Sequence, residues 1–180
     1  NKEIFAWRSR NPAIKYFLAD EIRVDPSAQN IFSLAPYEEV QTGAVKVKTF
    51  GSTDLGVSFL VQVRQVHIFH AGDFNWWYWY GETPAAIAEA ERLFKEEIEK
   101  IKGEHIDIAF FPVDQRLEHN YCVGADYFIA ELNPQYLVPM HFFDCPETPE
   151  KYAAKMKNSA TGIIPLNTPG QTAIVTIEKQ

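Results

Sequence analysis

Three polar clusters follow segments that we predict to be strands, and each holds side chains that can bind metal or move protons. The first contains Asp73, which ends an apolar segment with the pair Gly72-Asp73. The second is His141, which directly follows a short apolar segment. The third is Asp54, at the end of a small polar turn. Open α/β sheets tend to place their sites at strand ends, so these carboxylate and imidazole groups are candidates for metal or acid–base chemistry.

Each cluster also has a purely structural interpretation. An aspartate such as Asp73 or Asp54 often binds backbone amides within a turn. A single histidine such as His141 is often a hydrogen-bonded structural residue. No cluster decides between these interpretations by itself, so their order along the chain carries the argument.

Apolar spacing predicts the elements that position these clusters. Residues 44–69 alternate or run apolar between short polar breaks, which is typical of an antiparallel meander of three strands. Thr83 and Pro84 can begin a helix that ends at Gly103, with apolar residues three and four apart on one side. Further helices are expected at 2–10, 124–132 and 149–157, a turn at Asp25-Pro26, and strands at 14–18, 31–34, 106–111, 136–138 and 172–177.

This order, a meander followed by alternating helices and strands, predicts a layered α/β fold rather than a bundle or a pure β-sandwich. The chain has 180 residues, and no internal repeat or linker divides it, so we expect a single domain over residues 1–180. Asp73 and His141 would then lie at neighbouring strand ends, separated in sequence by a helix, a buried strand and another helix.

The composition of the chain limits the kinds of partner and the compartment that we expect. The formal net charge is −7 and no run of Lys or Arg forms a basic stripe, so neither nucleic acid nor an anionic membrane is expected to bind. No apolar run is long enough to span a bilayer, and the first residues lack the pattern of a signal peptide. Cys122 and Cys145 form no disulfide framework, so a reducing cytoplasm is the simpler expectation.

The clusters and their spacing resemble the metallo-β-lactamase superfamily. Within that superfamily, the sequence is similar to those of a branch of uncharacterised bacterial metal-dependent hydrolases that resembles ascorbate-phosphate lactonases. The resemblance covers nearly the whole chain and is carried by His70-Ala-Gly-Asp-Phe-Asn-Trp-Trp77, Gly103-Glu-His-Ile-Asp-Ile-Ala-Phe-Phe-Pro112 and Val138-Pro-Met-His-Phe142. It implies an αββα sandwich, of which these residues would form the C-terminal two-thirds.

The resemblance also implies a ligand set. Asp73 would bridge two metal ions and serve catalysis, and His141 would bind one of the ions. The cofactor would be a divalent transition metal, zinc first, with manganese or iron as alternatives. Many members carry another histidine after the first meander strand, where this sequence has Ser52. Asp54 beside it either binds metal in its place or caps the turn.

The superfamily's defining motif, His-x-His-x-Asp-His, would end just before Asn1. We therefore expect the 180 residues to be an N-terminally incomplete domain, inactive until the upstream segment of the same protein is supplied. A catalytic zinc site takes three protein ligands and a water, whereas Asp73 and His141 provide two, or three with Asp54.

Other residues near Asp73 are candidates with open roles. His70 either takes part in catalysis, by contacting the substrate or a metal ligand, or is a packed histidine. Asn75, Trp76 and Trp77 lie on the loop that follows Asp73 and are candidate substrate-binding residues. The two tryptophans either form an apolar wall over the pocket or pack in the core.

The sequence thus predicts a hydrolase that activates water at one or two metal ions and acts on a small molecule. The alternative is a non-catalytic member of the same fold that binds a ligand or a protein. A homo-oligomer is left open. The substrate does not follow from the fold, since one fold hosts many reactions.

Overall fold

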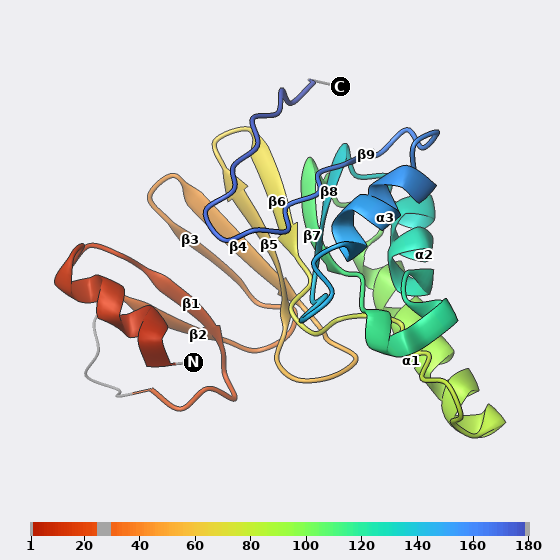
Figure 1. The fold of residues 1–180 in the computed structure, drawn as a ribbon. Coiled ribbons are helices and arrows are strands. Elements are labelled where there is room, and N and C mark those ends of the chain that lie inside the picture. Colours follow the sequence, from red (N-terminus) through yellow and green to blue (C-terminus); the bar gives the residue numbers. More distant parts are fainter. Residues whose placement is uncertain (1, 25–29, 179–180) are drawn as a thin grey trace.

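The computed structural model describes residues 2–24 and 30–178, and it contains a large seven-stranded sheet and a small two-stranded one (Figure 1). The large sheet has the order β3-β4-β5-β6-β7-β8-β9. Its first four strands pair antiparallel, and the strands from β6 to β9 pair parallel. Its strands are β3 (Glu39–Thr42), β4 (Val45–Phe50), β5 (Ser58–Val63), β6 (Val66–His70), β7 (Ile108–Pro112), β8 (Tyr136–Met140) and β9 (Gly162–Ile163).

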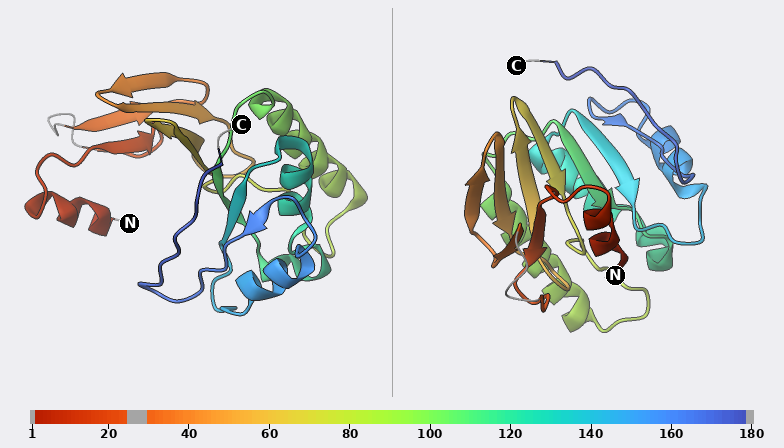
Figure 2. Two further views of the ribbon diagram at one scale, coloured as in Figure 1. Left: turned by 90° about the horizontal axis from the view of Figure 1, so that it is seen from above. Right: turned by 90° about the vertical axis from the view of Figure 1, so that its left-hand side faces the viewer.

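Three α-helices lie on one face of the large sheet (Figure 2). They are α1 (Pro84–Ile101), α2 (Val123–Leu132) and α3 (Thr148–Lys155). Helix α1 begins as the sequence predicts, because the Thr83 hydroxyl accepts a hydrogen bond from Ala86 N at 3.2 Å and Pro84 occupies the first turn. The core fills the space between these helices and the sheet, with fully buried members that include Phe69, Phe74, Phe94, Ile98, Phe111, Phe128, Leu137 and Tyr152.

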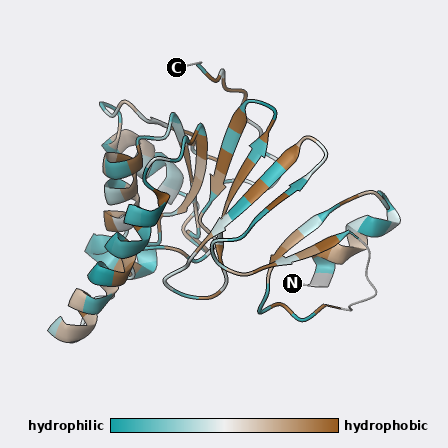
Figure 3. Ribbon diagram, turned by 180° about the vertical axis from the view of Figure 1, so that it is seen from behind, coloured by the Kyte–Doolittle hydropathy of each residue, from teal (hydrophilic) through white to brown (hydrophobic). Residues whose placement is uncertain are grey.

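The other face of the large sheet carries no α-helix among the described residues, and the C-terminal segment runs across it (Figures 1 and 2). Brown and teal alternate along several strands in Figure 3, as expected when one strand face is buried and the other is partly solvated. The chain between 164 and 178 is fixed by side chains, because Tyr136 Oη donates to Thr176 O at 3.1 Å and Glu178 N donates to Gln135 Oε1 at 2.9 Å.

The N-terminal elements form a separate small unit beside the sheet (Figure 1). Strands β1 (Tyr16–Ala19) and β2 (Ile31–Leu34) pair in parallel, and the preceding helix η1 (Lys2–Ser9) is a 3-10 helix. The turn expected at Asp25-Pro26 lies outside the described residues. Across the described residues, no helix is both long enough and apolar enough to cross a bilayer.

Two expectations for the sheet need correction. Strand β3 is not predicted by the sequence, because its alternating residues are all exposed or half-buried and give a weak apolar signal. The strand expected at 172–177 does not form, although its residues alternate; side chains of Tyr136 and Gln135 hold this segment instead of a strand partner. Ile174 in that segment is fully exposed, so the alternation there does not mark a buried face.

Candidate metal centre

The carboxyl ends of three parallel strands bring Asp73, Asp114 and His141 together. Asp73 lies three residues after β6, Asp114 two residues after β7, and His141 directly after β8. Backbone hydrogen bonds fix these strand ends to one another: Ala71 N donates to Phe110 O and Val113 N donates to Met140 O, both at 2.9 Å. Parallel neighbours end at the same edge of a sheet, so the chain places all three side chains in one region.

Both nitrogens of the His141 ring face a carboxylate. Nε2 lies 3.3 Å from Oδ1 of Asp73, and Nδ1 lies 2.9 Å from Oδ2 of Asp114. Asp114 is almost completely buried, with 1% of its side chain exposed, whereas Asp73 has 41% exposed. Asp114 therefore orients the ring from behind, and Nε2 is presented toward the solvent side beside Asp73.

His141 has a backbone φ of 66°, in the left-handed region that residues with a Cβ seldom adopt. Holding a residue there costs on the order of 1 kcal/mol, which the surrounding contacts must offset. Such outliers concentrate at functional sites, so this conformation supports a functional role for His141.

Arg116 completes the group around Asp114. Its Nη2 lies 2.5 Å from Oδ2 of Asp114 and its Nε 3.0 Å from each carboxylate oxygen, and Arg116 N donates to Oδ1 at 3.0 Å. Burial alone would raise the pKa of Asp114, but the hydrogen bonds from Arg116 and His141 outweigh it and lower that pKa. Asp114 is therefore a carboxylate at neutral pH and accepts a hydrogen bond from Nδ1–H of His141.

Aromatic side chains border this group. The Trp77 ring lies 5.5 Å from the His141 ring and stacks on Trp79 at 5.7 Å. The guanidinium of Arg116 lies 5.4 Å from the centre of the Trp79 ring and 4.3 Å from that of Phe143. Phe143 is 61% exposed, and Trp77 and Trp79 are half-buried, so part of this aromatic surface is open to a ligand.

The loop that holds Asp73 is fixed from two directions. Gly72 has a φ of 57°, and a Cβ there would lie 3.1 Å from Val57 O, so a side chain would be strained in this turn. Trp77 Nε1 donates to Asp73 O at 3.0 Å. Thr53 Oγ1 accepts from Asn75 N at 3.0 Å and donates to Asn75 O at 2.6 Å. The polar turn after β4 thus anchors the loop after β6.

Asn75 and Trp76 lie inside the molecule, with 1% and 8% of their surface exposed. Asn75 points toward helix α2, where a Cβ at Gly124 would come within 2.0 Å of Asn75 Oδ1. Trp76 packs in the core against Phe94 and Tyr127. In this conformation neither reaches a ligand, so we assign both to positioning the loop. Trp77 is the expected substrate-binding residue that retains exposed surface next to His141.

His70 ends β6 with an exposed side chain, and its ring stacks on Phe110 at 5.8 Å. Its Nδ1 accepts a hydrogen bond from Gly72 N at 3.1 Å, which helps to shape the Gly72-Asp73 turn. Although much of the residue's surface is open, atoms crowd the imidazole, and this burial lowers the pKa of His70. The ring is accordingly neutral at physiological pH, and a part for His70 in catalysis stays a prediction.

Asp54 is exposed, and its backbone N donates to Ser52 Oγ at 3.2 Å. Within residues 2–24 and 30–178, neither Asp54 nor the pair Asp73 and His141 belongs to a group of three or more side chains that could share one metal ion. Thr53, not Asp54, makes the contact from this turn to the Asp73 loop. Metal binding by Asp54 stays a prediction.

Sequence reasoning missed Asp114 and Arg116. Both follow a predicted buried strand, and the rule that selects Asp73 and His141 would also select Asp114. The stretch Gly103 to Pro112 carries part of the family resemblance, and Asp114 lies two residues beyond it.

The comparisons with known proteins bear on the fold. No family model matches the chain, and no curated protein matches it by sequence. Among solved structures, a suggested metal-dependent hydrolase from Parabacteroides distasonis aligns with a TM-score of 0.51 and 16% identity, over 72% of this chain and 55% of that one. A variant of the CmlA β-hydroxylase aligns with a TM-score of 0.51 and 9% identity, over 86% of this chain and 38% of that one.

CmlA is described as a diiron enzyme from Streptomyces venezuelae. A suggested zinc-dependent hydrolase of the metallo-β-lactamase superfamily from Thermotoga maritima aligns with a TM-score of 0.40 and 19% identity, over 73% of this chain and 62% of that one. The chain has a layered α/β fold like that of the Parabacteroides distasonis protein and of CmlA. At these identities the likeness establishes the fold alone, and the chain spans only 55% of the first structure and 38% of the second.

Proposed function

We propose that the intact protein is a metal-dependent hydrolase whose metal centre includes Asp73 and His141. The observation that carries the proposal is the placement of Nε2 of His141 3.3 Å from Oδ1 of Asp73, while the buried carboxylate of Asp114 holds the other ring nitrogen. Two ligand atoms on one zinc ion, each about 2.0 Å from it in a tetrahedral site, are separated by about 3.3 Å. The two donors therefore already have the spacing that one ion requires.

The donor chemistry also fits. An imidazole and a carboxylate are ligands of zinc, manganese and iron alike, so the pair agrees with any of these ions. Metal-binding histidines usually donate their second N–H to a carboxylate, which is the role that Asp114 fits here. When bound, such an ion lowers the pKa of a water molecule toward neutrality and polarises the scissile group. Asp73 and His141 would hold it, and Arg116 would keep Asp114 ionised.

Two donors are one fewer than a catalytic zinc site normally takes from protein. We propose that the intact domain supplies the others from a segment outside these 180 residues. The sheet face opposite the helices supports this, since it carries half-buried apolar side chains that a further layer would cover. They include Phe59, Val61, Ile68 and Phe110.

The substrate class is a small molecule bound next to the exposed aromatic surface of Trp77 and Phe143. Assignment to the bacterial branch that resembles ascorbate-phosphate lactonases, and to the cytoplasm, rests on the sequence resemblance and composition and is part of this proposal.

Metal analysis of the full natural protein tests the proposal. The wild type should hold one or two transition-metal ions at this centre. Asp73→Asn should lose at least one of these ions per chain. It should also fail to hydrolyse any member of a panel of lactone, phosphodiester, thioester and amide substrates that the wild type hydrolyses. The matched control is Asp20→Asn, an exposed aspartate in the N-terminal unit with no proposed part in metal binding. If Asp73→Asn keeps the wild-type metal content, the metal centre is wrong. If the wild type binds no metal, a non-catalytic ligand-binding member of the fold is the better description.

A further inference from the structure

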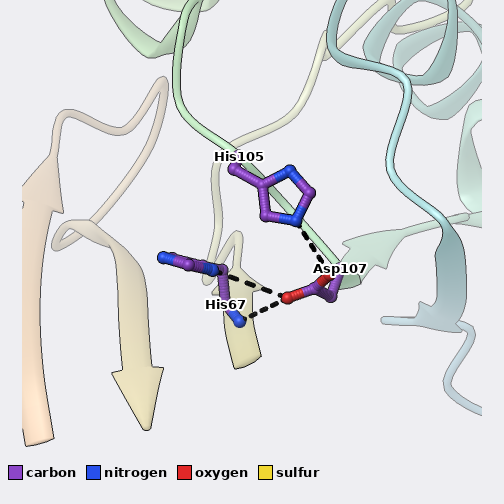
Figure 4. A group of neighbouring side chains, drawn as sticks. All are labelled: His67, His105 and Asp107. Carbon is purple, nitrogen blue, oxygen red and sulfur yellow. Dashed lines mark hydrogen bonds and ion pairs between the residues drawn. The ribbon is translucent and has the colours of Figure 1, made fainter. Parts of the chain in front are cut away.

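A second group of potential ligands lies at the opposite edge of the sheet. His67 is the second residue of β6, and His105 and Asp107 immediately precede β7. Asp73 and Asp114 follow the other ends of these same two strands. One ligand atom from each of His67, His105 and Asp107 lies within 4.8 Å of the other two, and Figure 4 shows the two rings converging on the carboxylate.

We propose that His67, His105 and Asp107 form a binding site for a divalent transition-metal ion, with zinc as the principal occupant. His105 Nε2 lies 2.9 Å from Oδ1 of Asp107, and His67 Nδ1 lies 3.5 Å from Oδ2. Donors around one tetrahedral zinc are about 3.3 Å apart. All three ligand atoms lie within 4.8 Å of one another, so any pair needs to close by at most about 1.5 Å, which side-chain rotation of the exposed His105 can supply.

An unsatisfied atom in this group supports a ligand. Nδ1 of His67 is buried and has no hydrogen-bond partner among the described residues. Buried polar atoms without a partner are rare in folded proteins, and a bound ion is one way to satisfy such an atom. A metal ion bound to Nδ1 would join this nitrogen to the carboxylate that it already faces.

The carboxylate is also held as a metal ligand usually is. Asp107 has 1% of its side chain exposed, and its Oδ2 accepts from His67 N at 2.7 Å. Its Oδ1 accepts from Gln135 Nε2 at 3.1 Å. These bonds orient the carboxylate and leave lone pairs on both oxygens.

The site has an open side. His67 also lines a cavity of ≈ 160 Å³ whose polar rim includes Glu104 and Gln62. The side chain of His105 is 44% exposed. An ion can therefore enter, and water can fill its remaining coordination position, as zinc requires when protein supplies three ligands. The ion would join the start of β6 to the start of β7 and act as a structural clamp.

Titration of metal-free protein with ZnCl₂, followed by calorimetry, tests the site. The variant is His105→Gln, which removes one ligand from an exposed position, and the matched control is His119→Gln, an exposed histidine elsewhere. Both are made in the Asp73→Asn background, so that zinc at the proposed catalytic centre does not contribute. We expect one zinc ion per chain in the background and control, and an affinity at least about 100-fold weaker in His105→Gln.

A second measurement distinguishes the loss of a zinc ligand from a general effect of the substitution on folding. Zinc should raise the Tm of the Asp73→Asn protein and of the control, but not that of His105→Gln, because a ligand stabilises only a state that binds it. X-ray absorption at the zinc edge should show two imidazoles and one carboxylate in the background protein. Equal zinc affinity in the background and in His105→Gln, or no zinc binding in the background, would overturn the site without touching the proposal for Asp73 and His141.

Discussion

Asp114→Asn is the most informative single change at the proposed metal centre. The substitution keeps the size of the side chain but removes its charge and replaces one acceptor oxygen with a donor nitrogen. That nitrogen must face either the guanidinium of Arg116 or Nδ1–H of His141, both of which are donors toward Asp114. The variant therefore breaks at least one charge-assisted hydrogen bond at a site where Asp114 is only 1% exposed.

The contacts set the size of the effect. Arg116 has 50% of its side chain exposed and can turn to water, so its ion pair contributes at most about 1 kcal/mol. The bond to His141 is less accessible, with 21% of the histidine side chain exposed, and a hydrogen bond to a charged group contributes about 1.5–3 kcal/mol. We expect the free energy of unfolding to fall by about 2–3 kcal/mol at pH 7. Metal affinity at Asp73 and His141 should weaken about 10- to 100-fold, because the ring loses its orienting partner.

The direction of the pH dependence of stability follows from the pKa of Asp114. The folded-state pKa of Asp114 is lowered from its ordinary value of 3.8. Its charge therefore stabilises the fold above that value, and this contribution is lost as the pH falls through the lower folded-state pKa. The difference in the free energy of unfolding between wild type and Asp114→Asn should be largest at pH 6–7 and should decrease in acid. Urea unfolding at several pH values measures it, with Arg116→Gln as the comparison that removes only the exposed partner.

A stability difference that stays constant from pH 7 down to acid would refute the reasoning, because the charge would then not be its source. Unchanged metal affinity in Asp114→Asn would refute the orienting role even if stability fell as expected.

Three further outcomes are expected. Gly124→Ala should destabilise the protein by about 1–3 kcal/mol in urea unfolding, because its Cβ would meet Asn75 Oδ1 at 2.0 Å. Thr53→Val should cost about 1–3 kcal/mol by the same assay, since both backbone bonds to buried Asn75 are lost, whereas Thr53→Ser should retain them. Asp54→Asn should leave metal affinity within about twofold of wild type if Asp54 is not a ligand, and weaken it by at least about tenfold if it is.

Much of the candidate centre could be predicted because strand direction is a strong constraint. Residues 66–70 and 136–140 are parallel segments of one sheet, and the 3.3 Å between Asp73 and His141 agrees with the expectation that these side chains lie close together. The expectation that they follow neighbouring strands is wrong, because β7 lies between β6 and β8. Asp114 follows the strand predicted at 106–111 and meets the same rule, but its contact with His141, 27 residues away, is evident only in the structure. Likewise, Thr53 acts through a contact 22 residues away in sequence, which periodicity does not predict.

The fold shows the same division between local and distant causes. Helix α1 was predictable from its cap and its apolar stripe, both of which are local. The segment at 172–177 alternates like a strand, but a strand also needs a backbone partner, and this segment is held by the side chains of Tyr136 and Gln135 instead. The sequence does not distinguish the positions of the two tryptophans, whereas their burial in the structure does. Trp76 is in the core, and the half-buried Trp77 lies against His141.

The geometry of β6 and β7 decides how variants at the two metal-binding edges can be compared. Each strand has five residues and therefore four intervals, so its ends are about 13 Å apart at about 3.3 Å per residue. The proposed sites share no ligand, so removing a ligand at one edge leaves the ligands at the other in place. A loss of metal in His105→Gln consequently reports on the edge that contains His67 and Asp107, and a loss in Asp73→Asn reports on the edge that contains His141.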